Sequence, residues 1–199
     1  MTIVIAISGP PGSGKSTLCS LLCHHFETSI YLSMDDFQLM TDWDPITLHR
    51  WFHRGADYNQ LPMPGLVEYL QAAITAQNHL VKDTENQHRF VFLESHLGSA
   101  TDALADLVNY VVWIDCGLDI CLARALIAMT TQNASPKSAE ISGCHDITHY
   151  LEQYIALTSK LLRLQNKRIR PFADYIYDGN DIEALICWII SKRTPFATS

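Results

Sequence analysis

The residues that could do chemistry begin near the amino end of this chain of 199 residues. Residues 9–16 read GPPGSGKS and fit the phosphate-binding loop pattern G-x-x-x-x-G-K-[ST] at every fixed position. Glycines let such a loop curl so that its backbone N–H groups point at phosphate oxygens, and a following helix adds its positive N-terminal end. Lys15 is expected to reach the β- and γ-phosphates, and the Ser16 hydroxyl to hold Mg²⁺. The pattern predicts a nucleoside triphosphate site formed by Gly9, Pro10, Pro11, Gly12, Ser13, Gly14, Lys15, Ser16 and Thr17.

The segments around this loop are those that the motif needs. Residues 2–8 form a near-continuous apolar, β-branched run, which is typical of a strand buried on both faces of a parallel sheet. After the loop, Leu18, Leu22 and Phe26 recur at helical spacing. The order of strand, loop and helix disfavours the alternative, which is a glycine-rich turn that carries an incidental lysine.

Carboxylates follow two further predicted strands, at the sheet edge where ligands bind in open parallel sheets. Asp35 and Asp36 come after a strand predicted at 29–33, and Glu94 closes a strand predicted at 90–94. A carboxylate beside the γ-phosphate can accept the proton of an incoming hydroxyl or organise Mg²⁺. The alternative is structural, with the two aspartates capping the next helix and Glu94 serving as a polar strand end.

Helical and extended patterns alternate along the chain, which predicts a parallel α/β sheet covered by helices on both faces. Residues 34–61 read as a polar, aromatic region, and residues 131–146 as a loop. The aromatic side chains between residues 43 and 58 could stack a base or form the apolar underside of a flap. Without a repeat, low-complexity tract or linker, one domain over residues 1–199 is the simplest account. The other predicted elements are strands at 110–115 and 174–177 and helices that begin near Pro64, Leu118, Leu151 and Asn180.

Composition limits the partners and the compartment. The net charge of −7 disfavours nucleic acid as the main partner and favours a small molecule. No apolar run approaches the roughly 20 residues of a membrane span, and the amino end lacks the features of a signal peptide. The 6 cysteines show no CxxC pair or metal-finger spacing, which predicts reduced thiols in a cytoplasmic protein without a structural metal. A homo-oligomer is compatible with the sequence.

The order of these motifs resembles that of the uridine kinase and nicotinamide riboside kinase family. The resemblance spans nearly the whole chain and is carried by the loop at 9–16, YLSMDDF at 31–37, the strand at 90–94, LEQYI at 151–155 and ADYI at 173–176. It implies a P-loop NTPase fold, a three-layer sandwich whose five-stranded parallel sheet has the order 2-3-1-4-5, with helices on both faces and a small lid at about 118–146. It also implies ATP and Mg²⁺ as cofactors and transfer of the γ-phosphate to a hydroxyl of a nucleoside or nucleoside-like acceptor.

The family's pattern also implies roles for single residues. Asp35 corresponds to the acidic residue that accepts the hydroxyl proton, and Glu94 to the one that assists Mg²⁺. Asp57 is nearest to the aspartate that holds ribose hydroxyls, although the phenylalanine that precedes that aspartate in the family is missing here. The predicted sets are therefore Lys15, Asp35 and Arg124 for catalysis, Ser16, Asp35 and Glu94 for the metal, and Asp36 and Asp57 for the substrate.

Departures from the family's pattern keep other functions open. The family's lid helix carries several arginines, whereas this chain retains Arg124 alone, so a nucleotide-binding regulator without transfer activity is one alternative. A kinase of a non-nucleoside alcohol such as glycerate is another, because the Ser-x-Asp-Asp-Phe segment also occurs in those kinases. ATP and GTP are not distinguished by the sequence. A basic cluster late in the helix that begins at Leu151 is expected to be solvated, namely Lys160, Arg163, Lys167, Arg168 and Arg170.

Overall fold

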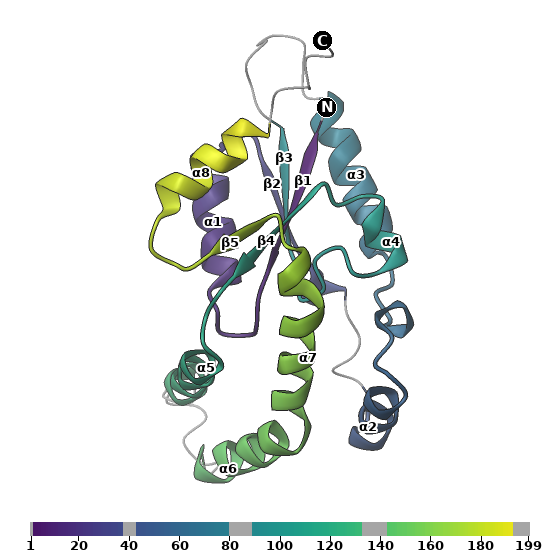
Figure 1. Ribbon diagram of the computed structural model, residues 1–199, viewed down its shortest axis with the longest axis vertical. Helices are drawn as coiled ribbons and strands as arrows, with labels where there is room; N and C mark the ends of the chain where they lie inside the picture. Colours follow the sequence, from purple (N-terminus) through teal and green to yellow (C-terminus); the bar gives the residue numbers. More distant parts are fainter. Residues whose placement is uncertain (1, 38–42, 80–88, 133–142, 193–199) are drawn as a thin grey trace.

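Five parallel strands form one sheet in the order β2-β3-β1-β4-β5, with helices on both faces (Figure 1). The computed structural model describes residues 2–37, 43–79, 89–132 and 143–192. The strand order and the three-layer arrangement implied by the family resemblance are confirmed. The strands are β1 (Ile3–Ser8), β2 (Ile30–Ser33), β3 (Phe90–Glu94), β4 (Tyr110–Ile114) and β5 (Tyr175–Tyr177).

The helices follow the strands in alternation, as the sequence predicted. The α-helices are α1 (Lys15–His25), α2 (Pro45–His53), α3 (Leu66–His79), α4 (Asp102–Ala105), α5 (Leu118–Gln132), α6 (Gly143–Gln153), α7 (Ser159–Ile169) and α8 (Ile182–Ser191). Short 3₁₀ turns are η1 (Met34–Asp36), η3 (Tyr58–Gln60) and η5 (Arg170–Phe172), and η4 (Tyr154–Thr158) is a π-helical segment.

Two apolar cores lie on opposite faces of the sheet, because alternate residues of each strand point to opposite sides. Val4 and Ala6 of β1 pack into the core that α3, α4 and α7 cover, whereas Ile5 and Ile7 pack into the core that α1 and α8 cover. These four side chains are at most 1% exposed. Burial on both faces explains why the strand reads as a continuous apolar run.

Helix α2 was missed by the sequence interpretation, which described residues 34–61 as a polar, aromatic region and assigned no helix there. The Asp44 side chain caps this helix by accepting hydrogen bonds from the backbone N–H groups of Ile46 and Thr47, and Pro45 occupies its first turn. Both signals are present in the sequence. The mixture of aromatic and basic residues that follows them obscured the helical pattern.

Several predicted boundaries were also wrong. The helix expected from Leu151 begins at Gly143 and contains η4, α3 begins at Leu66 rather than at Pro64, and α5 continues to Gln132. The loop predicted at 131–146 is therefore helical at both ends. Its residues 133–142, and with them part of the predicted lid, lie outside the described residues.

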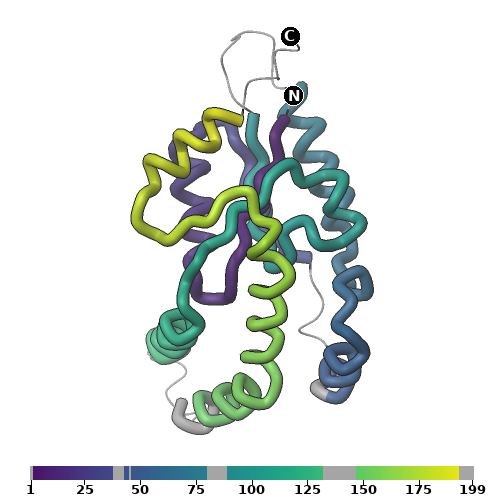
Figure 2. The backbone as a smooth tube through the Cα atoms, in the orientation of Figure 1, coloured from purple at the N-terminus to yellow at the C-terminus, as the bar shows by residue number. Residues whose placement is uncertain are grey.

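Four helices extend beyond the carboxyl ends of the strands. Figure 1 and the tube in Figure 2 show α2, α5, α6 and the first turns of α7 on that side of the sheet, while α1, α3 and α8 lie along it. The phosphate-binding loop, which joins β1 to α1, emerges at the same edge. Side chains distant in sequence are therefore gathered around this loop.

The packing of α3 on the sheet gives a test of the fold. Leu70 is fully buried in the core beneath α3, and replacement by Ala removes apolar contacts and leaves a cavity. We expect Leu70→Ala to lower the free energy of unfolding by about 2–5 kcal/mol, measured by urea denaturation. Glu68→Ala, at an exposed position of the same helix, is the control and should change it by no more than about 0.5 kcal/mol.

Candidate active site

The phosphate-binding loop adopts the conformation that its glycines permit. Gly12 and Gly14 have φ angles of +80° and +102°, in the left-handed region, and Gly14 is the N-cap residue of α1. The backbone N–H of Ser13 donates to the carbonyl of Pro10 at 3.1 Å, which closes the turn. A Cβ at Gly12 would lie 2.6 Å from the carbonyl oxygen of Cys121, so α5 packs directly on the loop.

Lys15 is held inside the loop and is only 4% exposed. Its Nζ donates to the carbonyl of Pro10 at 3.3 Å. Burial lowers the pKa of the Lys15 ammonium from its ordinary value, and the carboxylates of Glu94 and Asp35 oppose this shift. The ammonium is thus desolvated and aimed into the loop, where a phosphate would provide a strong ionic partner.

Glu94 joins the sheet to the first turn of α1. Its Oε1 accepts a hydrogen bond from the Ser16 hydroxyl at 2.8 Å, and its Oε2 accepts one from the Tyr31 hydroxyl. Burial, with the hydrogen bond to Glu94 as a second cause, raises the pKa of the Tyr31 phenol, which therefore stays protonated as a donor. A hydroxyl beside a carboxylate is a donor set that suits Mg²⁺, which is bound through one or two carboxylates together with phosphate oxygens.

Asp35 is paired with His96, a residue that the sequence interpretation missed. The Oδ1 atom of Asp35 lies 2.8 Å from Nε2 of His96, and the side chains are 50% and 28% exposed. The hydrogen bond from His96 is the main cause that lowers the pKa of Asp35, although burial acts in the opposite direction. The sequence position of His96 could have indicated a role in the site, because His96 comes two residues after the end of β3, at the edge of the sheet where ligands bind.

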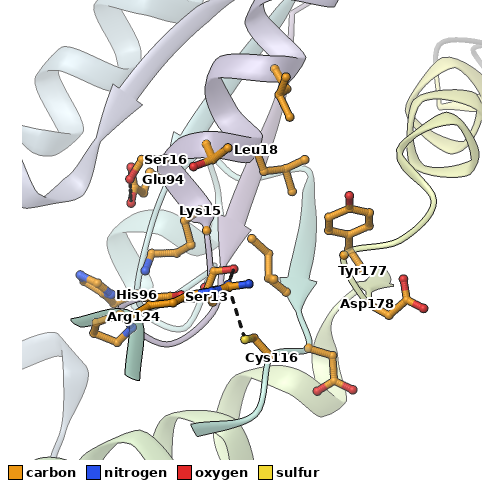
Figure 3. Close-up of a pocket in the computed structure, with 18 of the residues that line it drawn as sticks. Ser13, Lys15, Ser16, Leu18, Glu94, His96, Cys116, Arg124, Tyr177 and Asp178 are labelled. Atoms are coloured by element: carbon orange, nitrogen blue, oxygen red, sulfur yellow. Dashed lines mark hydrogen bonds between the residues drawn. The ribbon is translucent and has the colours of Figure 1, made fainter. Parts of the chain in front are cut away.

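Arg124 reaches the loop from α5. Its Nη1 donates to the carbonyls of Gly12 and Ser13 at 3.2 and 3.4 Å and to Sγ of Cys116 at 3.8 Å (Figure 3). The guanidinium therefore lies against the outside of the phosphate-binding turn. The role of Arg124 as a cation near the transferred phosphate stays a prediction.

These groups line a cavity of about 820 Å³, called here the donor cavity. Figure 3 shows Lys15, Ser16 and Glu94 on one side of it and Tyr177 and Asp178 on the other. Its volume lies in the range of small-molecule and cofactor sites. The lining residues are Pro11–Leu18, Leu21, Asp35, Glu94, His96, Ile114–Gly117, Arg124 and Tyr177–Gly179.

A smaller cavity of about 190 Å³, called here the apolar cavity, adjoins the donor cavity. Pro11 and His96 line both cavities, and Met34, the neighbour of Asp35, lines the apolar one. The two spaces therefore meet next to the Asp35–His96 pair. The remaining lining residues are Trp51, Tyr58, Leu61, Met63, Leu97, Thr158, Leu161, Leu162 and Gln165.

Not every predicted site residue is brought to a cavity. Of the predicted set, Pro11, Gly12, Ser13, Gly14, Lys15, Ser16, Thr17, Asp35, Glu94 and Arg124 line the donor cavity, whereas Gly9, Pro10, Asp36 and Asp57 line neither. The exposed Asp57 carboxylate instead caps η3 by accepting from the backbone N–H of Asn59 at 3.0 Å. The Asp57 carboxylate therefore has a local structural partner, and its role in holding the acceptor stays a prediction.

The basic cluster in α7 and η5 is less solvated than the sequence suggested. Arg168 donates to the carbonyls of Gly55 and Ala56, both at 2.6 Å, and its guanidinium lies 5.2 Å from the ring centre of Tyr58. Arg170 forms an ion pair with Asp115 at 2.8 Å. Lys160, Arg163 and Lys167 are exposed, as predicted.

The structure also bears on predictions made from composition. Cys19, Cys23, Cys116, Cys121 and Cys187 are free thiols, as expected, and the side chain of Cys144 is outside the described part of the chain. Within the described ranges, no helix is long and apolar enough to cross a membrane. Nor do three or more His, Cys, Asp or Glu side chains come together there as a metal-binding group.

Comparison with known proteins identifies the fold. No family model and no curated protein match the chain. Among solved structures, TT1252 from Thermus thermophilus aligns with a TM-score of 0.50 at 16% identity, over 98% of this chain and 99% of that one. A possible uridine kinase from Bacillus stearothermophilus aligns with a TM-score of 0.47 at 16% identity, over 89% of each chain. At this identity the likeness concerns the fold alone, which is the parallel α/β sheet in the order 2-3-1-4-5 covered by helices.

The packing of α5 on the phosphate-binding loop gives a second test. In Gly12→Ala, the new Cβ would be strained by the positive φ and would collide with the Cys121 carbonyl. We expect ATP affinity, measured by calorimetry, to fall by more than about tenfold, because the cost should exceed about 1.4 kcal/mol. Gly55→Ala is the control, since Gly55 has a φ of +104° with no atom near the added Cβ and lines neither cavity. Equal ATP affinity in the wild type and Gly12→Ala would show that the loop tolerates a side chain here.

The Asp35–His96 pair predicts a pH dependence. His96→Leu removes the hydrogen bond that lowers the pKa of Asp35, so that pKa should rise, measured by carbon NMR of the labelled carboxyl. A depressed pKa in the folded state also means that the pair stabilises the fold above the pKa of the unfolded carboxyl, about 3.9. The stability difference between the two proteins should therefore disappear as the pH falls through the folded-state pKa. An unchanged Asp35 pKa in the variant would exclude this coupling.

Proposed function

We propose that this chain transfers the γ-phosphoryl group of ATP to a hydroxyl of a small molecule. The observation that carries the proposal is the meeting of the donor and apolar cavities at Pro11 and His96, with Asp35 at their boundary. A phosphate-binding loop alone is shared by kinases, switches and motors. A second cavity that opens beside the loop and next to a carboxylate supplies the place that an acceptor requires.

The donor side follows from the loop. Its backbone N–H groups and the Lys15 ammonium would hold the phosphate oxygens, and Arg124 would move from the loop carbonyls toward the transferred group. Ser16 and Glu94 are the residues that would hold Mg²⁺, together with Asp35. When bound, the metal would neutralise negative charge on the phosphate oxygens.

The acceptor side depends on Asp35. The carboxylate is unprotonated at neutral pH, as its lowered pKa requires, and so has a free lone pair for the proton of the alcohol. His96 orients this carboxylate by hydrogen bonding to Oδ1. The bond between the γ-phosphorus and the oxygen bridging to ADP breaks, a bond to the alcohol oxygen forms, and the alcohol proton passes to Asp35 and then to solvent.

Two kinds of acceptor were expected from the sequence. The resemblance favours a nucleoside or nucleoside-like molecule, whereas glycerate would bring a carboxylate that needs a cation. Among the described residues that line the apolar cavity, none is Lys or Arg. This disfavours a glycerate-like acceptor within the proposed activity.

Replacement of Asp35 separates a kinase from a nucleotide-binding regulator. Asp35→Asn should lower kcat by about 10²–10⁴-fold, because the proton acceptor is lost, while the Kd for ATP changes little. The measurements are acceptor-dependent ADP release and calorimetry. Asp36→Asn is the matched variant at the adjacent carboxylate. A larger loss of kcat in Asp36→Asn than in Asp35→Asn would show that Asp36, not Asp35, accepts the proton. If the wild type binds ATP but phosphorylates no acceptor in a broad panel, the regulator becomes the better description.

A further inference from the structure

The walls of the apolar cavity come from segments far apart in the sequence. Met34 belongs to η1, Trp51 to α2, Tyr58 to η3 and Leu161 to α7, and Leu97 follows β3. Trp51, Tyr58 and Met34 are at most 8% exposed. None of the lining residues within the described ranges is Asp, Glu, Lys or Arg. The cavity is therefore a space between packed elements whose described wall carries no Asp, Glu, Lys or Arg.

The Trp51 and Gln165 N–H donors of this wall are already engaged within the protein. The indole N–H of Trp51 donates to the carbonyl of Asp57 at 2.9 Å. The Gln165 side-chain amide donates to the carbonyls of His96 and Gly9, at 2.6 and 3.3 Å. Its Oε1 is buried and has no hydrogen-bond partner among the described residues. The Trp51 and Gln165 N–H groups are therefore engaged within the protein, whereas Gln165 Oε1 is left as one acceptor for a ligand.

Tyr58 and His96 each have one side-chain partner within the protein. The Tyr58 side chain is hydrogen-bonded to Arg168, which also spans the Gly55 and Ala56 carbonyls and so fixes this wall of the cavity. His96 is bonded to Asp35. Thr158, the remaining polar residue of the lining, lies at the end of η4. A ligand with several hydroxyls would lose its hydration here and gain few partners in return.

We propose that the acceptor is an alcohol whose body is apolar and about the size of one aromatic ring, such as an aryl-methanol, rather than a nucleoside. This inference rests on the proposed kinase function and specifies its substrate class. The volume of about 190 Å³ agrees with it, since cavities of about 150 Å³ with apolar walls bind benzene. The ring lies among Met34, Trp51 and Leu161, and the hydroxyl is directed to the end that the donor cavity shares, next to Asp35.

The test compares acceptors of equal ring size with the wild-type protein, ATP and Mg²⁺. Benzyl alcohol and 5-(hydroxymethyl)uracil both present a hydroxymethyl group on a six-membered ring, but the second adds polar ring atoms. Uridine and glycerate complete the panel. We expect benzyl alcohol to have the highest kcat/KM, by at least about tenfold. Each polar group of an acceptor that is buried without a partner should lower kcat/KM by about tenfold or more. Mass spectrometry of the phosphate ester separates transfer from ATP hydrolysis.

A cavity variant tests the place of binding. Leu161→Asn puts an amide into the apolar wall, so kcat/KM for benzyl alcohol should fall by about tenfold or more while the Kd for ATP is unchanged. Arg163→Gln is the control on the same helix, since Arg163 is exposed and lines neither cavity. Equal effects of the two substitutions on kcat/KM would place the acceptor elsewhere and overturn the inference.

The outcomes distinguish the inference from the kinase function on which it rests. If uridine or 5-(hydroxymethyl)uracil is phosphorylated with a higher kcat/KM than benzyl alcohol, the apolar acceptor is wrong and the kinase function stands. If wild-type protein binds ATP but forms no phosphate ester with any acceptor, both are wrong. A preference for benzyl alcohol that Leu161→Asn reduces supports both.

Discussion

The parallel pairing of β1 with β3 is the constraint on which the site depends. In this register Ile7 lies beside Glu94, so a carboxylate at the end of β3 reaches the Ser16 hydroxyl, 78 residues earlier in the chain. On the other side of β3, β2 pairs so that Ser33 lies beside Glu94, which places Asp35 at the same edge. A slip of one residue would turn Glu94 to the opposite face of the sheet and separate it from the loop.

The charges gathered at this edge explain why a metal and a polyphosphate would have to bind together. Lys15 is almost completely buried, and its cost of burial is offset by the carboxylates of Glu94 and Asp35. Those carboxylates would repel a triphosphate held by the loop, unless a divalent cation lies between them. The buried lysine, the hydroxyl of Ser16 and the two carboxylates therefore form one electrostatic arrangement.

The donor side could be predicted from the sequence because its information is local. The loop at 9–16 is contiguous, the apolar strands before it and at 90–94 are recognisable as runs, and Glu94 stands at the end of one of them. What sequence reasoning missed is held by contacts between distant segments. Gln165 donates to the carbonyl of His96, 69 residues away, and no spacing rule relates such residues. The predicted role of Asp57 in holding the acceptor stays a prediction, and its Oδ1 makes the local cap that Asp commonly forms in turns.

The wall of the apolar cavity differs from a pocket suited to a nucleoside for one physical reason. The segment from Trp51 to Tyr58 satisfies its polar groups internally: the Trp51 indole uses the Asp57 carbonyl, and Arg168 binds the Gly55 and Ala56 carbonyls and covers Tyr58. A polar network closed in this way presents a largely apolar surface to the cavity, where Gln165 Oε1 is left as a buried acceptor without a partner. Because the two cavities share Pro11 and His96 among the described residues, the chemistry of this wall can change while the phosphate and metal groups stay in place. The same fold can therefore keep one phosphoryl donor and accept a different class of alcohol.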